Sequence, residues 1–408
     1  MAVPNGVWRG TVAAPGPIFT VQDEQPGVNK KLVTLIKRFL PLLFGVAVMA
    51  YLFAYQIKLD DISRQVRVSE RKGSNLIVEY DGARATIPAH EFTADSADLQ
   101  NGVWTKPGIL SVTRKVEPTT LLLALLLGGV GFAAAALRLK YLVSLLGYRV
   151  SFARSAVYSL IGQLYNSAIP GGTVGGDAVK ALYLAGHMER KAHAFAAVLI
   201  DRICGLFTLG TLALIVLLPS IHEESMRAAA VVIISFLGAG SLAVVLMLSR
   251  RVRRLFPEGA ASRLPFREAL IAFNDSVQVY RGHMGGIALA LALSVLPQLG
   301  WISMHVALGD GLRIQNVGWY DYMVLVPVSG MVASLPISFG GWGVGELATV
   351  YFFGLRGVPA EQAFVLSALG RLTQLAWALI GLPISFFLPR PKQMADKLAQ
   401  EAAVEPPA

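Results

Sequence analysis

The chain has 408 residues, of which 54% are hydrophobic and only 15% are charged. Soluble proteins are usually about 25% charged and about 45–50% apolar, so this composition excludes an ordinary cytosolic enzyme and predicts an integral membrane protein. The net charge of +10 fits Lys and Arg retained on cytoplasmic loops, and we expect no nucleic-acid partner. With one cysteine and no metal-ligand spacing among the six histidines, we expect no disulfide framework, no metal site and no other cofactor.

The first 56 residues predict a tail followed by a membrane helix. Residues 1–31 are rich in Pro, Gly and polar side chains, which is typical of a disordered segment. In residues 32–56 an apolar run follows basic residues. This pattern predicts an uncleaved first transmembrane helix whose N-terminal side lies in the cytoplasm.

Residues 57–117 form the one long polar stretch of the chain. Two runs, 76–80 and 83–87, flank Asp81-Gly82, which is a strong signal for a two-residue hairpin. We therefore expect a small β-rich domain on the extracytoplasmic side. The sequence leaves open whether this domain binds a partner or shields a substrate path.

Five further apolar segments are long enough to cross a bilayer. They lie at about 119–138, 193–218, 226–248, 284–307 and 360–388. Basic residues, beginning with Arg138 and Lys140, mark alternate ends of these segments. The positive-inside rule then holds throughout only if the two Gly/Pro-interrupted segments, 152–190 and 319–357, each begin and end on one side.

We therefore predict an all-α polytopic protein of the cell inner membrane, with about six full transmembrane helices and two re-entrant helical hairpins. Each hairpin could instead be two full spans, because the parity is the same. The flippase-like transmembrane domain would cover residues 118–388, and residues 389–408 would form a cytoplasmic tail. Both termini are then cytoplasmic.

The two interrupted segments resemble each other. Each contains Pro and a glycine cluster, and then Gly followed by a carboxylate, Asp177 in the first and Glu346 in the second. An arginine follows each carboxylate after 25 residues, at Arg202 and Arg371. Because one copy begins inside and the other outside, we interpret them as an inverted repeat of about 152–218 and 319–388. Such repeats with broken helices are typical of secondary transporters, whose binding site lies near the midplane.

The glycine clusters predict helix breaks inside the membrane. Backbone amides freed by a break cannot face lipid, so we expect them to line a polar cavity. A helix that begins there directs N–H groups at an anion such as a lipid phosphate; close helix packing is the alternative. The glycines concerned are Gly172, Gly176, Gly341 and Gly345.

Arg202 and Arg371 lie in otherwise apolar helices, where an ionised side chain costs at least about 2.5–3.5 kcal/mol. Each therefore needs a partner. The repeat nominates Asp177 for Arg202 and Glu346 for Arg371, or the swapped pairs. Such pairs could be purely structural. They could also open, so that the arginines bind a phosphate and the carboxylates bind a cationic or hydroxylated headgroup.

Four more polar residues lie near these pairs. Asp201 stands beside Arg202 and could neutralise it, which would leave the carboxylate of the first pair for the substrate. Lys180, one turn into the new helix, could be a second phosphate contact or a lysine that snorkels to the interface. We expect Gln163 and Asn166 to bridge helices.

The ordered motifs are Pro170-Gly171-Gly172, Gly176-Asp177, Asp201-Arg202, Gly340-Gly341, Gly345-Glu346 and Arg371. On these motifs, residues 118–388 resemble the flippase-like transmembrane region of lysylphosphatidylglycerol synthases. The resemblance implies that this region translocates a phospholipid. In bifunctional members a separate cytoplasmic synthetase domain aminoacylates that lipid. We expect no such domain here, because only about 20 residues follow Leu388, and Lys180 stands where we expect the family to favour Arg.

We therefore predict a translocase rather than an enzyme, one that moves a phospholipid or other lipid-linked anionic or zwitterionic headgroup across the membrane. The first alternative is a membrane subunit of a lipid headgroup transferase system that works with a separate synthetase partner. The second is a scaffold or receptor that binds an extracytoplasmic partner through residues 57–117. A homo-oligomer is compatible with each of these.

Overall fold

The computed structural model describes most of the chain. The described residues are 30–72, 75–80, 83–88, 92–94, 101–168, 174–248, 277–315, 317–335 and 337–404. Gly172, one of the predicted site residues, lies outside these ranges. The predicted N-terminal tail, residues 1–31, also lies outside them except for residues 30 and 31.

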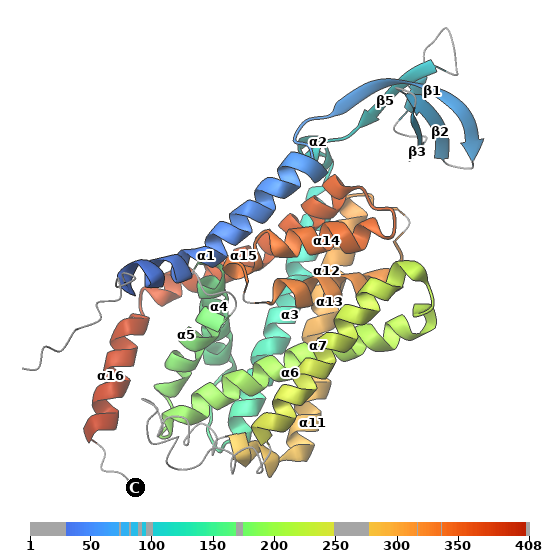
Figure 1. The fold of residues 1–408 in the computed structure, drawn as a ribbon. Helices are drawn as coiled ribbons and strands as arrows, with labels where there is room; N and C mark the ends of the chain where they lie inside the picture. Colours follow the sequence, from blue (N-terminus) through green and yellow to red (C-terminus); the bar gives the residue numbers. More distant parts are fainter. Residues whose placement is uncertain are drawn as a thin grey trace, which may run out of the picture.

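The first helix, α1 (Lys30–Tyr51), continues as a π-helical turn, η1 (Leu52–Gln56). It runs obliquely along one side of the helical bundle and leads up to the β-sheet (Figure 1). Its apolar part, Leu40–Gln56, is shorter than a full membrane span. A first full crossing over residues 32–56 therefore stays a prediction.

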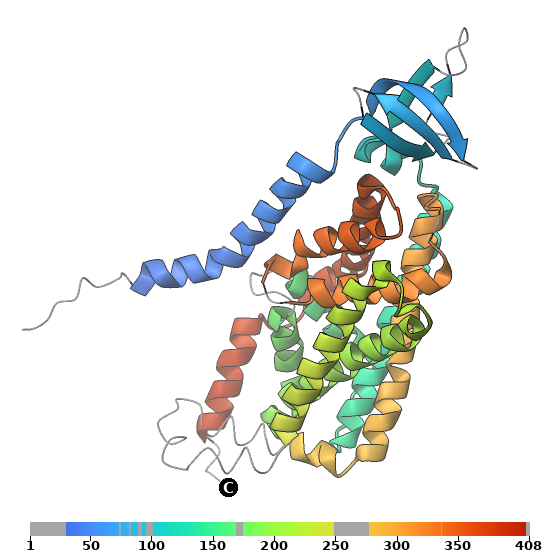
Figure 2. The same ribbon diagram turned by 45° about the vertical axis from the view of Figure 1, so that its right-hand side comes forward.

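A five-stranded antiparallel sheet follows α1, and Figures 1 and 2 show it at one end of the bundle. Its strands are β1 (Ile62–Lys72), β2 (Asn75–Tyr80), β3 (Ala83–Pro88), β4 (Phe92–Ala94) and β5 (Asn101–Lys106). The order in the sheet is β3-β2-β1-β5-β4. Tyr80 pairs with Ala83, so the two strands predicted around residues 81–82 do pair as a hairpin. Val66, Val78 and Ile87 form part of a small core of the sheet.

Within the described residues, five helical stretches are long and apolar enough to cross a membrane. They correspond to α3 (Pro118–Leu145), α6 (Lys191–Leu217) with η3 (Leu218–Ser220), α7 (Glu224–Leu248), α11 (Met284–Leu293) with α12 (Val295–Gly311), and α15 (Ala360–Ser385). These are the five apolar segments expected from the sequence. The chain is therefore a multi-pass membrane protein that contacts the bilayer.

Two pairs of shorter helices carry the glycine-rich breaks. The first pair is α4 (Phe152–Ala168) with α5 (Val174–Ala185), and the second is α13 (Trp319–Ala333) with α14 (Val344–Gly354), which η4 (Phe339–Gly341) precedes. Even α4, with 17 residues, is only about 25 Å long at 1.5 Å per residue, against a hydrocarbon core of about 30 Å. Figure 1 shows α4 and α5 in the half of the bundle near α16 (Pro391–Val404) and α13 and α14 nearer the sheet.

The two pairs are held together by the long helices that follow them. Within each pair the helices pack side by side, and each pair also packs on its following helix, α5 on α6 and α14 on α15. In addition, α15 packs on α4, and α6 packs on α13. Each long helix thus contacts the first helix of the other pair.

Glycine is required where η4 leads into α14. Gly340, Gly341 and Gly343 have φ angles of 53°, 77° and 80°, in the left-handed region where a side chain is strained. This backbone turns sharply at its glycines and directs the carbonyl groups of Gly340 and Gly341 toward α15.

Candidate functional site

A cavity of about 470 Å³ lies among α3, α4, α5, α6, α12, α13, α14 and α15, within the range of about 300–1,000 Å³ that is usual for small-molecule sites. The predicted site residues that line it are Asp177, Lys180, Asp201, Arg202, Gly345 and Arg371. Glu346 stands behind Arg371 and is fully buried. The structure therefore brings charged residues of both interrupted segments to one cavity.

The first predicted ion pair is present. Arg202 Nη1 lies 3.3 Å from Asp177 Oδ2. The two side chains keep 29% and 22% of their surface exposed, respectively, and both line the cavity. This pair is therefore open to a molecule in the cavity.

Asp201 serves a different pair of cations from the one expected. Its Oδ1 accepts a hydrogen bond from Arg138 Nε at 2.7 Å, and its Oδ2 accepts one from Lys180 Nζ at 3.1 Å. The hypothesis that Asp201 neutralises Arg202 is wrong, because these two cations hold its carboxylate. The snorkelling alternative for Lys180 is also wrong, since its side chain is only 10% exposed and points to a buried carboxylate.

Arg138 is the main charged residue that sequence reasoning missed. The sequence pattern predicts a basic residue at one end of a span, but α3 continues to Leu145 and buries Arg138 beside Asp201. Ser294, at the break between α11 and α12, accepts a hydrogen bond from Arg138 Nη1 at 2.9 Å. The signal was available, because an arginine inside a long apolar helix needs a partner.

The second predicted ion pair is also present, in a tighter setting. Arg371 Nε contacts Glu346 Oε1, Nη1 donates to the carbonyl of Gly340 at 2.9 Å, and Nη2 donates to the carbonyl of Gly341. The guanidinium also lies 5.0 Å from the centre of the Trp342 ring, within cation–π range. Every nitrogen of Arg371 therefore has a partner in its own chain.

The expectation that the Gly176 amide faces the cavity is wrong, and the amide of Gly343, at the start of the other new helix, is also bonded within the protein. Gly176 N–H donates to Asn166 Oδ1 at 2.8 Å, and Gly343 N–H donates to Glu346 Oε2 at 2.6 Å. The glutamate, at N3, thus makes the carboxylate half of a capping box, the half that a glycine N-cap leaves available. At Gly176 the close-packing alternative also applies, because a Cβ there would overlap the carbonyl oxygen of Gly162.

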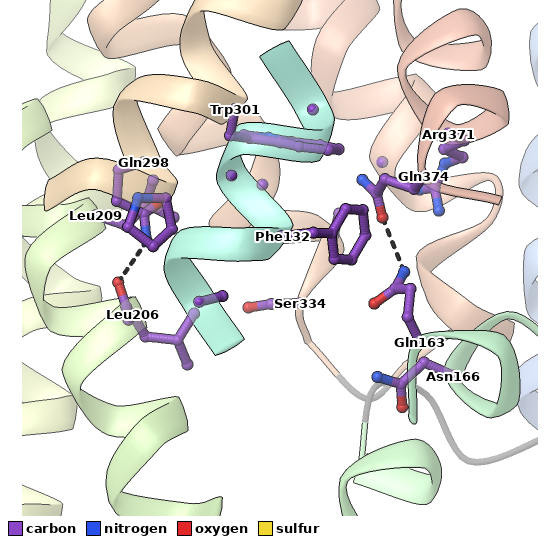
Figure 3. Close-up of a pocket in the computed structure, with 18 of the residues that line it drawn as sticks. Phe132, Gln163, Asn166, Leu206, Leu209, Gln298, Trp301, Ser334, Arg371 and Gln374 are labelled. Carbon is purple, nitrogen blue, oxygen red and sulfur yellow. Dashed lines mark hydrogen bonds between the residues drawn. The ribbon is translucent and has the colours of Figure 1, made fainter. Parts of the chain in front are cut away.

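Amides and aromatic rings complete the cavity wall. Gln163 of α4 donates to Gln374 of α15 at 2.9 Å, and Figure 3 shows these side chains pointing toward each other beside Phe132. With the Asn166 bond to α5, both residues expected to bridge helices do so. Gln298 donates to the carbonyl of Gly205 at 3.0 Å. The sequence does not predict Gln298 and Gln374 as site residues, because a single amide side chain in an apolar helix belongs to no motif or repeat.

A family model described as the lysylphosphatidylglycerol synthase TM region matches residues 107–381. The chain belongs to this family. The match includes both short-helix pairs and every ion pair described above, whereas α1 and the whole sheet lie outside it. No curated protein matches the chain.

In this member of the lysylphosphatidylglycerol synthase family, the cavity has a basic character. Its described lining contains four basic and two acidic side chains, and Glu346 adds a third acidic group behind Arg371. One positive charge is therefore in excess among these residues. The charged residues that line the cavity are Arg138, Asp177, Lys180, Asp201, Arg202 and Arg371.

Proposed function

We propose that the chain is a lipid translocator that moves a phospholipid, or another lipid with an anionic or zwitterionic headgroup, between leaflets through this cavity. The observation that carries the proposal is the exposed Arg202–Asp177 pair in a basic cavity of a multi-pass membrane protein. Ionised groups are costly at such depth and are usually functional. A cavity with one excess positive charge suits a headgroup that contains a phosphate.

Within this proposal, the roles of the two ion pairs differ. Arg202 binds the phosphate, and Asp177 balances an amine or hydroxyl of the headgroup when the pair opens. Lys180 adds a second positive charge near the pair, with its Nζ 4.0 Å from Asp177 Oδ1. Arg371 and Glu346 keep the second glycine loop in place, because their polar atoms are engaged with that loop. The function is transport, with no chemical step.

We further infer that the short-helix pairs are re-entrant hairpins related as an inverted repeat. Three features support this inference: the helices are too short to span, the pairs lie in opposite halves of the bundle, and the packing of α15 on α4 mirrors that of α6 on α13. The translocator would lie in the cell inner membrane with both termini in the cytoplasm. Alternating movement of the two repeats would then expose the cavity to each leaflet in turn.

A proteoliposome assay tests this proposal. The purified chain is reconstituted with a phospholipid that carries a fluorescent label on one acyl chain, and headgroup transfer is followed by quenching of the outer leaflet. We expect Arg202→Ala and Arg371→Ala to reduce transfer, the second by disturbing the loop. Arg390→Ala, an exposed arginine outside the cavity, is the matched control. Unchanged transfer in both cavity variants would refute the assigned roles.

A further inference from the structure

Helix α1 touches the bundle through a narrow stripe. Gly45 and Leu52 are buried, whereas Leu43 and Val46, on either side of Gly45, remain 62% and 58% exposed. Residues seven apart fall on one face of a helix. One face of α1 therefore rests on the bundle, and the rest is available to lipid.

The contact at Gly45 is made to the second glycine loop. A Cβ at Gly45 would lie 3.0 Å from the carbonyl oxygen of Trp342 and 3.7 Å from Ser338 Cβ, and a Cβ at Gly343 would lie 2.5 Å from the carbonyl oxygen of Gly45. The two backbones thus meet with no side chain between them. A glycine-to-glycine contact involves few atoms, so dispersion holds it weakly.

The same loop bounds the cavity and meets the first hairpin. Gly340 and Trp342 line the cavity together with Asn166, near the end of α4. A Cβ at Gly340 would lie 3.0 Å from the carbonyl oxygen of Asn166. Figure 2 shows α1 at one side of the bundle, with its N-terminal part standing away from the other helices. The end of α4, the loop of residues 338–343 and α1 therefore meet beside the cavity, with the loop between α1 and the end of α4.

We propose that α1 is a lateral gate. When the face of α1 that contains Gly45 separates from the loop of residues 338–343, the cavity opens sideways to the bilayer. A headgroup can then enter the cavity while its acyl chains stay in lipid. This inference rests on the proposed transport function. Because α1 lies outside the family match, the gate is a feature of this chain beyond the matched region.

A disulfide that fixes α1 to the loop tests the gate. Gly45→Cys with Ser338→Cys is suitable, since a Cβ–Cβ distance of 3.7 Å falls in the disulfide range of about 3.5–4.5 Å. The Ser338 hydroxyl has no hydrogen-bond partner among the described residues, so its replacement breaks no bond there. The background carries Cys204→Ala, which removes the one native cysteine. Each single-cysteine variant is the control.

We expect oxidation of the double variant to lower headgroup transfer at least tenfold, and reduction to restore it. Transfer that is equally fast in the oxidised and reduced protein overturns the gate while leaving the transport function intact. If the unmodified chain transfers no lipid, the transport function itself fails.

A second measurement tests the gate if the double-cysteine variant is inactive even when it is reduced. Spin labels at Leu43→Cys and Tyr351→Cys occupy exposed positions on α1 and α14. We expect two distances whose populations change between vesicles of phosphatidylcholine and vesicles containing phosphatidylglycerol. A single unchanged distance overturns the gate.

Discussion

The two halves of the cavity contain ion pairs with the same spacing in the sequence and different surroundings. Arg202 and Asp177 are 3.3 Å apart and partly exposed, whereas Arg371 forms an ion pair with the fully buried Glu346 and hydrogen bonds to two loop carbonyls. The repeat thus specifies where the charges stand. The loops around them decide whether a pair is open to a ligand or fixed in place.

The difference follows from which side chain caps the new helix. In the second half, Glu346 caps Gly343 and pairs with Arg371 at once. In the first half, the Gly176 amide is bonded to Asn166, Asp177 pairs with Arg202, and within the described residues Asp177 accepts no capping hydrogen bond from an amide of α5. A carboxylate without a capping function can exchange partners, and a carboxylate with two structural functions cannot do so without loss of stability.

We expect the largest loss of stability from Glu346→Ala. It leaves the buried charge of Arg371 unpaired, which costs about 3–5 kcal/mol for a buried pair, and it also removes the cap of α14. Asp177→Ala is the matched variant in the first half and should cost much less, because its pair is partly exposed. Thermal unfolding in detergent measures both. Equal losses of stability would contradict the division into a fixed and an open pair.

Gly176→Ala tests the close contact between α4 and α5. The new Cβ would overlap the Gly162 carbonyl, and such overpacking costs about 1–3 kcal/mol. Gly354→Ala is the control, because a Cβ at Gly354 meets no atom within 4 Å. We expect a clear fall in the unfolding temperature for the first variant and no fall for the second. A similar result for both variants would argue against the tight contact.

Substituting the two cavity arginines by glutamine separates binding from stability. Arg202→Gln should change the free energy of unfolding by at most about 1 kcal/mol, as for exposed pairs, and should lower transfer at least tenfold. Arg371→Gln should be the less stable of the two. The assay reports initial transfer rates per folded protein. If Arg371→Gln is as stable as the unmodified chain and Arg202→Gln transfers lipid at the normal rate, the division into a fixed pair and an open pair is wrong.

The smallest effect concerns a carboxylate outside both halves. Asp61 accepts hydrogen bonds from Gly108 N–H at 2.7 Å and from the Ser111 hydroxyl at 2.9 Å. These bonds, first the backbone one, hold the pKa of Asp61 below its ordinary value of 3.8. The lowered pKa means that this stabilisation is present above pH 3.8 and is lost as pH falls through the folded-state pKa.

Asp61→Asn should therefore slightly increase hydrogen exchange of the α2 amides at neutral pH, and the difference from the unmodified chain should vanish in acid. Transfer through the cavity should not change. A strong effect on transfer would mean that the sheet end of the molecule is coupled to the ion pairs.

Much of the fold could be predicted because apolar length and glycine breaks are local signals. The five long helices, the paired strands around residues 81–82 and the two ion pairs all follow from such signals. The sequence pattern misplaces Arg138, because a basic residue near the end of an apolar run gives the same pattern whether its helix ends there or continues. Asp201, which stands beside Arg202 in the sequence, is then left as a possible neutralising charge for that arginine.

The roles of the capping residues could not be predicted from spacing. That Asn166 accepts the Gly176 N–H depends on how α4 packs against α5, a contact between separate helices. Likewise, the carbonyls that hold Arg371 face it because of the left-handed φ angles at Gly340 and Gly341. These are properties of the packed loop and leave no periodic trace in the sequence.

Native mass spectrometry of the purified chain tests the central claim most directly. The intact protein should retain a phosphate-containing lipid, and Arg202→Gln should lose most of it while remaining folded. Arg390→Ala should retain as much lipid as the unmodified chain. Equal retention of that lipid by Arg202→Gln would contradict a headgroup site at the Arg202–Asp177 pair.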